Sequence, residues 1–100
     1  MEAFKGLKGH PLNNPVRLGI MVFLLSKERA LFKTLQNVLE LTPGNLDSHL
    51  KALEREGYVE LKKAIADRPR TVVVITERGA RETRKYLEML KEILKDIEKY

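Results

Sequence analysis

The sequence lacks features on which several classes of protein depend. It has no cysteine, which excludes disulfides, thiol catalysis and metal sensing through cysteine. It has two histidines, His10 and His49, and their separation matches no familiar zinc-binding spacing, so neither a metal nor another cofactor is expected. No apolar run is long enough to span a bilayer, so no membrane partner is expected.

Signals for secretion and catalysis are also missing. Residues 1–9 contain two lysines but no apolar block after them, so we expect no signal peptide and a cytoplasmic protein. The chain has no glycine-rich phosphate loop and no recognisable pairing of a nucleophile with a base. Catalytic residues are therefore not expected, and the protein is not expected to be an enzyme.

The composition is that of one small, basic, folded domain. The 100 residues include 43% hydrophobic and 33% charged residues, which predicts a single globular domain over residues 1–100. The formal net charge of +5 fits a polyanionic partner, although many basic proteins bind none. Where the charges lie is more informative than their sum.

The segment from residue 41 to 59 predicts a helix of about residues 43–56 with two different faces. Thr42 suits the N-cap, Pro43 suits the first helical position, and Gly57 ends the helix. One face is an apolar stripe of leucines at spacings of four and three: Leu46, Leu50 and Leu53. The opposite face has small, polar or basic side chains and no acidic one: Gly44, Asn45, Ser48, Lys51, Ala52 and Arg55. Such a face fits an ordinary solvated helix or a helix that enters a DNA groove.

Two helices are expected before this segment, and residues 1–13 are expected to be irregular. Asn14 is a candidate N-cap, with Pro15 at the start of a helix that runs to about Ser26. Residues 30 and 31 fit either a very short strand or the approach to a second helix over residues 32–39. The expected core positions are Val16, Ile20, Phe23, Leu24, Leu35, Val38 and Leu39. The short connection to Pro43 is typical of a helix-turn-helix.

A β-hairpin with a basic tip is expected next. Residues 58–65 alternate between apolar and charged side chains, and residues 71–75 are rich in β-branched ones. Residues 66–70 between them form a turn with two arginines, Arg68 and Arg70, stiffened by Pro69. The expected fold is therefore α+β, mainly α, with a two- or three-stranded antiparallel sheet.

The last helix, over residues 77–100 with Thr76 as its cap, has more apolar surface than a small domain can bury. Its stripe has the spacings three, four and three, and is formed by Leu87, Leu90, Leu94 and Ile97, widened by Tyr86, Met89, Ile93 and Tyr100. We expect the same helix of a second copy to cover it, with Met21 and Leu25 as further candidates. The predicted dimer interface is Phe4, Leu7, Tyr86, Leu87, Leu90, Ile93, Leu94 and Ile97. The alternative is that the stripe packs back on its own domain.

This order of elements is the layout of a winged helix-turn-helix domain, with a core over residues 14–76 and a C-terminal dimerisation helix over 77–100. Over residues 15–83 the chain resembles the winged-helix transcriptional regulators related to the MarR and ArsR groups, of the small archaeal and bacterial type. The resemblance rests on LT-x-GNL-x-x-HL-x-x-LE-x-x-GYV from Leu41 to Val59, on RPRT from Arg68 to Thr71, and on Thr76 with Gly79.

The resemblance implies a homodimeric regulator that binds a pseudo-palindromic operator in double-stranded DNA. The helix over residues 43–56 would lie in the major groove, and the wing at residues 66–70 on the minor groove or backbone. Asn45 would read adenine, and Lys51 or Arg55 would contact phosphate or guanine. The implied DNA-binding residues are Lys33, Thr34, Gly44, Asn45, Ser48, Lys51, Arg55, Arg68 and Arg70.

Each of these roles has a plainer alternative. Asn45 would satisfy local backbone groups, Lys51 and Arg55 would be solvated or pair with neighbouring glutamates, and Arg68 would pair with Asp67. His49 is expected at the boundary of the core. For the whole chain, the alternative is a winged-helix protein-interaction module without specific DNA reading. A small-molecule effector between the dimer helices and the DNA-binding part is a further option.

Overall fold

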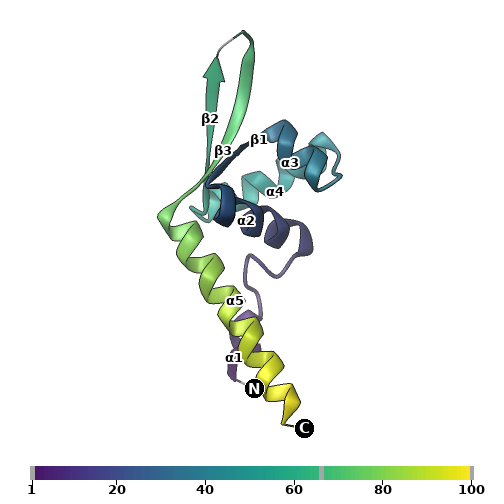
Figure 1. The fold of residues 1–100 in the computed structure, drawn as a ribbon, viewed down its shortest axis with the longest axis vertical. Helices are drawn as coiled ribbons and strands as arrows, with labels where there is room; N and C mark the ends of the chain where they lie inside the picture. Colours follow the sequence, from purple (N-terminus) through teal and green to yellow (C-terminus); the bar gives the residue numbers. More distant parts are fainter. Residues whose placement is uncertain (1, 66, 100) are drawn as a thin grey trace.

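The computed structural model describes residues 2–65 and 67–99 and has the expected α+β winged-helix architecture (Figure 1). The elements, in chain order, are α1 (Glu2–Leu7), α2 (Pro15–Lys27), β1 (Arg29–Leu31), α3 (Phe32–Val38), α4 (Pro43–Arg55), β2 (Val59–Ile65), β3 (Pro69–Ile75) and α5 (Glu77–Glu98). The molecule is elongated, at 57 × 25 × 21 Å. The β2–β3 hairpin projects at one end, and α5 with α1 beside it forms the other end.

Side-chain caps set the starts of the long helices where the sequence predicts them. The Asn14 side chain accepts hydrogen bonds from the backbone N–H groups of Val16 and Arg17, each at 3.0 Å. The Thr42 hydroxyl accepts one from the N–H of Asn45 at 3.2 Å. These caps satisfy donors that a helix start leaves without intrahelical partners. At the other end of α4, Gly57 has a φ of 77°, a left-handed conformation that glycine adopts without strain.

The core lies where α2, α3, α4 and the sheet meet. Leu46, Leu50 and Leu53 are fully buried, which confirms the apolar stripe of α4. Two expectations about this part of the fold are wrong. Val38, expected in the core, is the last residue of α3 and is 53% exposed. Met21, a candidate for the dimer interface, is fully buried inside the protomer.

The sheet has three antiparallel strands in the order β1–β3–β2. Residues 29–31 therefore form the very short strand, with Arg29 opposite Val74 and Leu31 opposite Val72. The β2–β3 hairpin, which we call the wing, is longer than predicted: Pro69 lies opposite Ile65 and is already part of β3. Residue 66 of the predicted turn lies outside the described residues.

The N-terminal segment is not irregular as expected, because residues 2–7 form α1, which packs along α5. Gly6 permits this close contact, since a Cβ built there would lie 2.9 Å from the Met89 sulfur. Further along, Leu12 is fully buried and the His10 ring lies 4.8 Å from the Tyr86 ring. The segment is therefore ordered by its packing on α5. We call α1 and residues 86–98 of α5 the α1–α5 arm.

Candidate nucleic-acid interface

Five of the six residues that the sequence places on the outer face of α4 are exposed, and the sixth, Ala52, is half-buried. Gly44, Asn45, Ser48, Lys51 and Arg55 lie on the side away from the buried leucines. Within residues 2–65 and 67–99, no ion pair joins Lys51 or Arg55 to Glu54 or Glu56. These side chains are therefore available to an external partner.

Asn45 takes part in the helix start only through its backbone. Its N–H donates to the Thr42 hydroxyl, and its side chain forms no hydrogen bond with any residue the structure describes. The alternative in which the amide side chain satisfies local backbone groups is thus not observed. An exposed amide near the N-terminus of a helix can donate and accept at the same time, as bidentate contact with adenine requires.

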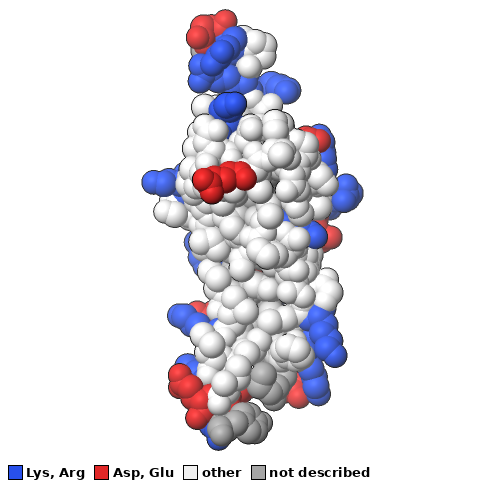
Figure 2. Space-filling view, turned by 90° about the vertical axis from the view of Figure 1, so that its right-hand side faces the viewer, with Lys and Arg blue, Asp and Glu red and all other residues white. Residues whose placement is uncertain are grey.

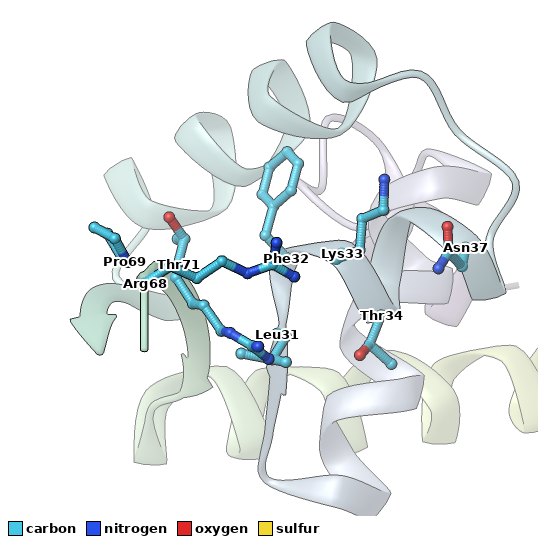
Figure 3. A pocket seen from close by; sticks show the side chains of 9 residues that line it. Leu31, Phe32, Lys33, Thr34, Asn37, Arg68, Pro69 and Thr71 are labelled. Carbon is cyan, nitrogen blue, oxygen red and sulfur yellow. The ribbon is translucent and has the colours of Figure 1, made fainter. Parts of the chain in front are cut away.

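A hollow of about 530 Å³ lies between the wing and the start of α3 (Figure 3). We call it the α3–wing hollow. It brings together four of the predicted DNA-binding residues, Lys33, Thr34, Arg68 and Arg70. In Figure 3, Arg68 and Pro69 of the wing lie on one side of the hollow, and Lys33, Thr34 and Asn37 of α3 lie on the other. The hollow therefore collects three cations from segments about 35 residues apart in sequence, which suits a phosphate-bearing partner.

The wing contains one ion pair near its tip. The Arg70 guanidinium lies 3.7 Å from the Asp67 carboxylate, and both side chains are well exposed. The partner predicted for Asp67 as the plainer alternative is Arg68, whereas the observed ion pair is with Arg70. An exposed pair of this kind contributes little free energy, so phosphate can compete for Arg70.

A second hollow, of about 460 Å³, separates α4 from the strands of the wing. We call it the α4–wing hollow. Phe32 and Thr71 line both hollows. The residues that sequence reasoning missed are Asn37 in the first hollow and Asp47, Glu54, Lys62 and Lys63 in the second. The consecutive lysines of β2 were a usable signal, since a strand beside a basic turn extends its positive surface.

All eight residues of the predicted dimer interface lie on the α1–α5 arm, and their exposure divides them into three groups. Phe4, Leu94 and Ile97 are 50%, 62% and 54% exposed. Four more are half-buried: Leu7, Leu87, Leu90 and Ile93. Tyr86 is a correction, because it is 4% exposed and belongs to the protomer's own core beside His10. Tyr100 lies outside the described residues.

The surface of the arm has few charges along its middle. Figure 2 shows an uncharged band over the lower part of the molecule, bordered on both sides by lysine, arginine and acidic side chains. Charged side chains along α5 form ion pairs with one another, such as Lys91 with Glu88 at 3.5 Å and Lys95 with Glu92 at 3.7 Å. The arm also exposes the large apolar side chains of Phe4, Leu94 and Ile97. Exposed apolar side chains on a surface with a charged border are typical of a protein–protein contact surface.

The two histidines are half-buried and lie in structural environments. Burial lowers the pKa of His10, whose Nδ1 accepts a hydrogen bond from the Leu12 N–H at 3.0 Å. Burial, followed by the charge of Arg17, lowers the pKa of His49, which lies at the edge of the core as expected. In the part of the chain that the structure describes, no group of three metal-ligating side chains comes together. Likewise, no described helix is long and apolar enough to cross a bilayer.

The fold and the basic surface beside α4 define a winged-helix DNA-binding domain, and the chain belongs to that family. The family model described as "Winged helix DNA-binding domain" matches residues 16–94. The match runs from α2 through the wing to most of α5. It therefore includes both hollows and much of the arm.

Known proteins similar to this chain include two from archaea. A transcriptional regulator homologue from Pyrococcus horikoshii OT3 has 54% sequence identity and a TM-score of 0.92, over 97% of this chain and 98% of its own. The uncharacterised protein MJ0432 of Methanocaldococcus jannaschii is 39% identical over 87 residues, which is 86% of this chain and 95% of that protein. The structure of reduced AbfR bound to DNA has a TM-score of 0.76 and 20% identity, over 90% of this chain and 62% of that one. That last likeness concerns the fold.

Proposed function

We propose that the protein is a cytoplasmic homodimeric transcriptional regulator that reads a pseudo-palindromic operator in double-stranded DNA. The observation that carries the proposal is the α3–wing hollow beside the exposed face of α4. There, Lys33, Arg68 and Arg70 line one concave surface, although they come from separate parts of the chain. Membership of a DNA-binding family supports this assignment.

In this proposal α4 enters the major groove with its N-terminal half nearest the bases. Asn45 reads an adenine, Ser48 donates to phosphate or a base, and Gly44 lets the helix backbone approach the DNA. Lys51 and Arg55 contact phosphate or a guanine. Lys33, Thr34 and the wing arginines bind the backbone beside the groove, with the wing tip on the minor groove or its phosphates.

The dimer part of the proposal rests on the arm. Phe4, Leu94 and Ile97 are each at least half exposed, and large apolar side chains gathered on one arm favour contact with a second copy. Two α4 helices related by a two-fold axis would meet successive turns of the major groove, about 10 base pairs apart.

Binding to a randomised duplex library, titrated at several salt concentrations, tests the DNA function. We expect one preferred pseudo-palindromic sequence. We also expect log affinity to fall against log salt with a slope of about −5 to −9, as for about six to ten phosphate contacts. A protein that binds all duplexes alike, with a slope near zero, would contradict the proposal.

Sedimentation of Leu94→Asp/Ile97→Asp tests the dimer separately. We expect a dimer for the unsubstituted chain and a monomer for the variant, because each aspartate would be buried without a partner at the interface. Val38→Asp is the matched control, since Val38 is 53% exposed and Ile97 is 54% exposed, but Val38 lies on α3. A control that also dissociates, or a double variant that stays dimeric, would refute the proposed interface.

A further inference from the structure

The α4–wing hollow contains two carboxylates in a surface that is otherwise basic. Asp47 and Glu54 line it together with Lys51, Lys62 and Lys63. Because both acidic residues line this hollow together with residues of the wing, they lie on the flank of α4 that faces the wing. Their position explains why the outer face of α4 has no acidic residue while the surface beside it has two.

The lysines of β2 are engaged with other partners. Lys62 lies 3.5 Å from the Glu60 carboxylate, and Lys63 donates a hydrogen bond to the Thr71 hydroxyl at 2.9 Å. Asp47 lies four residues before Lys51, a spacing that allows an ion pair on a helix. Even so, no ion pair within 4.0 Å involves Asp47 among the residues described. Its carboxylate is exposed and open to the hollow.

An open carboxylate next to DNA has a cost that depends on sequence. The carboxylate repels phosphate wherever the protein is placed along the DNA. Because it can only accept hydrogen bonds, it also repels the acceptor atoms of guanine and thymine. The cost is offset where an exocyclic amino group of a base donates to it. In the major groove, the N4 amino group of cytosine is the donor that a lone carboxylate matches.

Position along the helix separates the two acidic residues. Asp47 is the fifth residue of α4, in the half that a recognition helix turns toward the bases. Glu54 comes seven residues later, which is about 10 Å further along the helix axis. At that distance Glu54 would lie beside the DNA backbone and act through its charge alone.

We propose that Asp47 is a specificity-determining residue that accepts a hydrogen bond from the N4 amino group of a cytosine in each half-site. The inference rests on the proposed DNA-binding function and adds one base preference to it. In this role Asp47 lowers affinity for DNA in general and restores it only where the cytosine is present.

Base preferences of the full chain and of Asp47→Asn, measured on the same randomised duplex library, test the proposal. The substitution keeps the shape of the side chain and one acceptor oxygen but replaces the other with a donor. The amide therefore matches adenine at two atoms, N6 and N7, and cytosine at one, so the preference should change from cytosine to adenine. We expect the cytosine preference, about 5- to 150-fold for one good base contact, to be lost at one position per half-site. Affinity for unrelated DNA should rise roughly 2- to 5-fold, as expected for removal of one charge near phosphate in water.

Glu54→Gln is the matched control, because it removes the same charge from the same hollow. It should raise affinity for unrelated DNA to a similar extent and leave every base preference unchanged. Circular dichroism should show both variants folded, since both side chains are exposed.

Two outcomes would overturn the inference in distinguishable ways. If the unsubstituted chain is sequence-specific and Asp47→Asn keeps every base preference, Asp47 does not read a base, and the proposed function stands. If the unsubstituted chain has no sequence preference, the proposed function fails and the role of Asp47 fails with it.

Discussion

Gly79, near the start of α5, should be intolerant of any side chain. A Cβ built there would overlap the Tyr58 carbonyl oxygen, and it would lie 2.9 Å from the carbonyl carbon and 3.0 Å from the Met21 methyl group. The Tyr58 carbonyl also accepts a hydrogen bond from the Thr76 N–H at 3.1 Å. Because backbone atoms form the obstacle, α5 itself would have to move in Gly79→Ala.

The cost follows from what that movement breaks. Overpacking of a buried site costs about 1–3 kcal/mol. Loss of the hydrogen bonds from the Thr76 N–H to the Tyr58 carbonyl and from the Gly79 N–H to the Thr76 hydroxyl would cost about 1 kcal/mol each. Alanine recovers about 1 kcal/mol through its helix propensity. We therefore expect Gly79→Ala to lower the free energy of unfolding by about 2–4 kcal/mol. For a domain of this size, that corresponds to a fall in Tm of about 10–25 °C.

Gly44→Ala is the matched control, because it is also a helical glycine and its Cβ would have no atom within 4 Å. It should raise the free energy of unfolding by about 0.5–1 kcal/mol. Thermal and urea unfolding followed by circular dichroism measure both variants, at one fixed protein concentration because a dimer unfolds in a concentration-dependent way. A Tm for Gly79→Ala within two or three degrees of the unsubstituted chain, roughly the effect of a tolerated surface change, would refute the steric argument.

Three further predictions concern the fold and the DNA contacts. Burial lowers the pKa of His10, so the stabilising contribution of this side chain is complete above its unfolded pKa of about 6.5 and is lost as the pH falls. Between pH 8 and pH 5, the Tm of His10→Gln should therefore drop less than the Tm of the unsubstituted chain. An equal drop in the two proteins would contradict this. Arg68→Ala/Arg70→Ala should weaken binding to every duplex and make the salt slope shallower by about two units per protomer, whereas weakening confined to one sequence would argue against phosphate contact. The Thr76 hydroxyl donates to the Gly57 carbonyl at 2.6 Å and accepts from the Gly79 N–H at 2.9 Å. Thr76→Val should therefore lower the free energy of unfolding, measured in urea, by about 1–2 kcal/mol. Thr42→Val should lower it by less, because the Thr42 hydroxyl forms the single cap bond to the Asn45 N–H.

The features that sequence predicts well here are those set by local chemistry. Asn14, Thr42 and Thr76 all cap the helices expected of them, because a side-chain acceptor three residues before a free N–H needs no distant partner. The glycine that follows Thr76 by three residues in the family motif is also explained by the structure, since only glycine lets α5 approach the Tyr58 carbonyl at position 79.

The features that sequence predicts poorly depend on contacts between distant segments. Glycines at positions 6 and 9 argue against a helix at the N-terminus, yet α1 forms because it packs on α5 beside Met89. Tyr86 has the periodicity of an interface residue, but the N-terminal segment folds back and buries it next to His10. The sequence does not predict a role for Asp47, because the helical repeat gives its direction on α4 but not the location of the wing.

One helix connects the two proposed contact surfaces. At its start, α5 is fixed to the base of the wing: Gly79 packs on Tyr58, and the Arg78 guanidinium donates to the Glu56 carbonyl at 2.9 Å while lying over the Tyr58 ring. At its other end, it carries the exposed apolar residues of the arm. Since α5 is one continuous helix and its start cannot slide against the wing, the orientation of the arm determines that of α4. If two arms pair as proposed, the separation of the two α4 helices, and with it the spacing of the half-sites, is set by the geometry of α5.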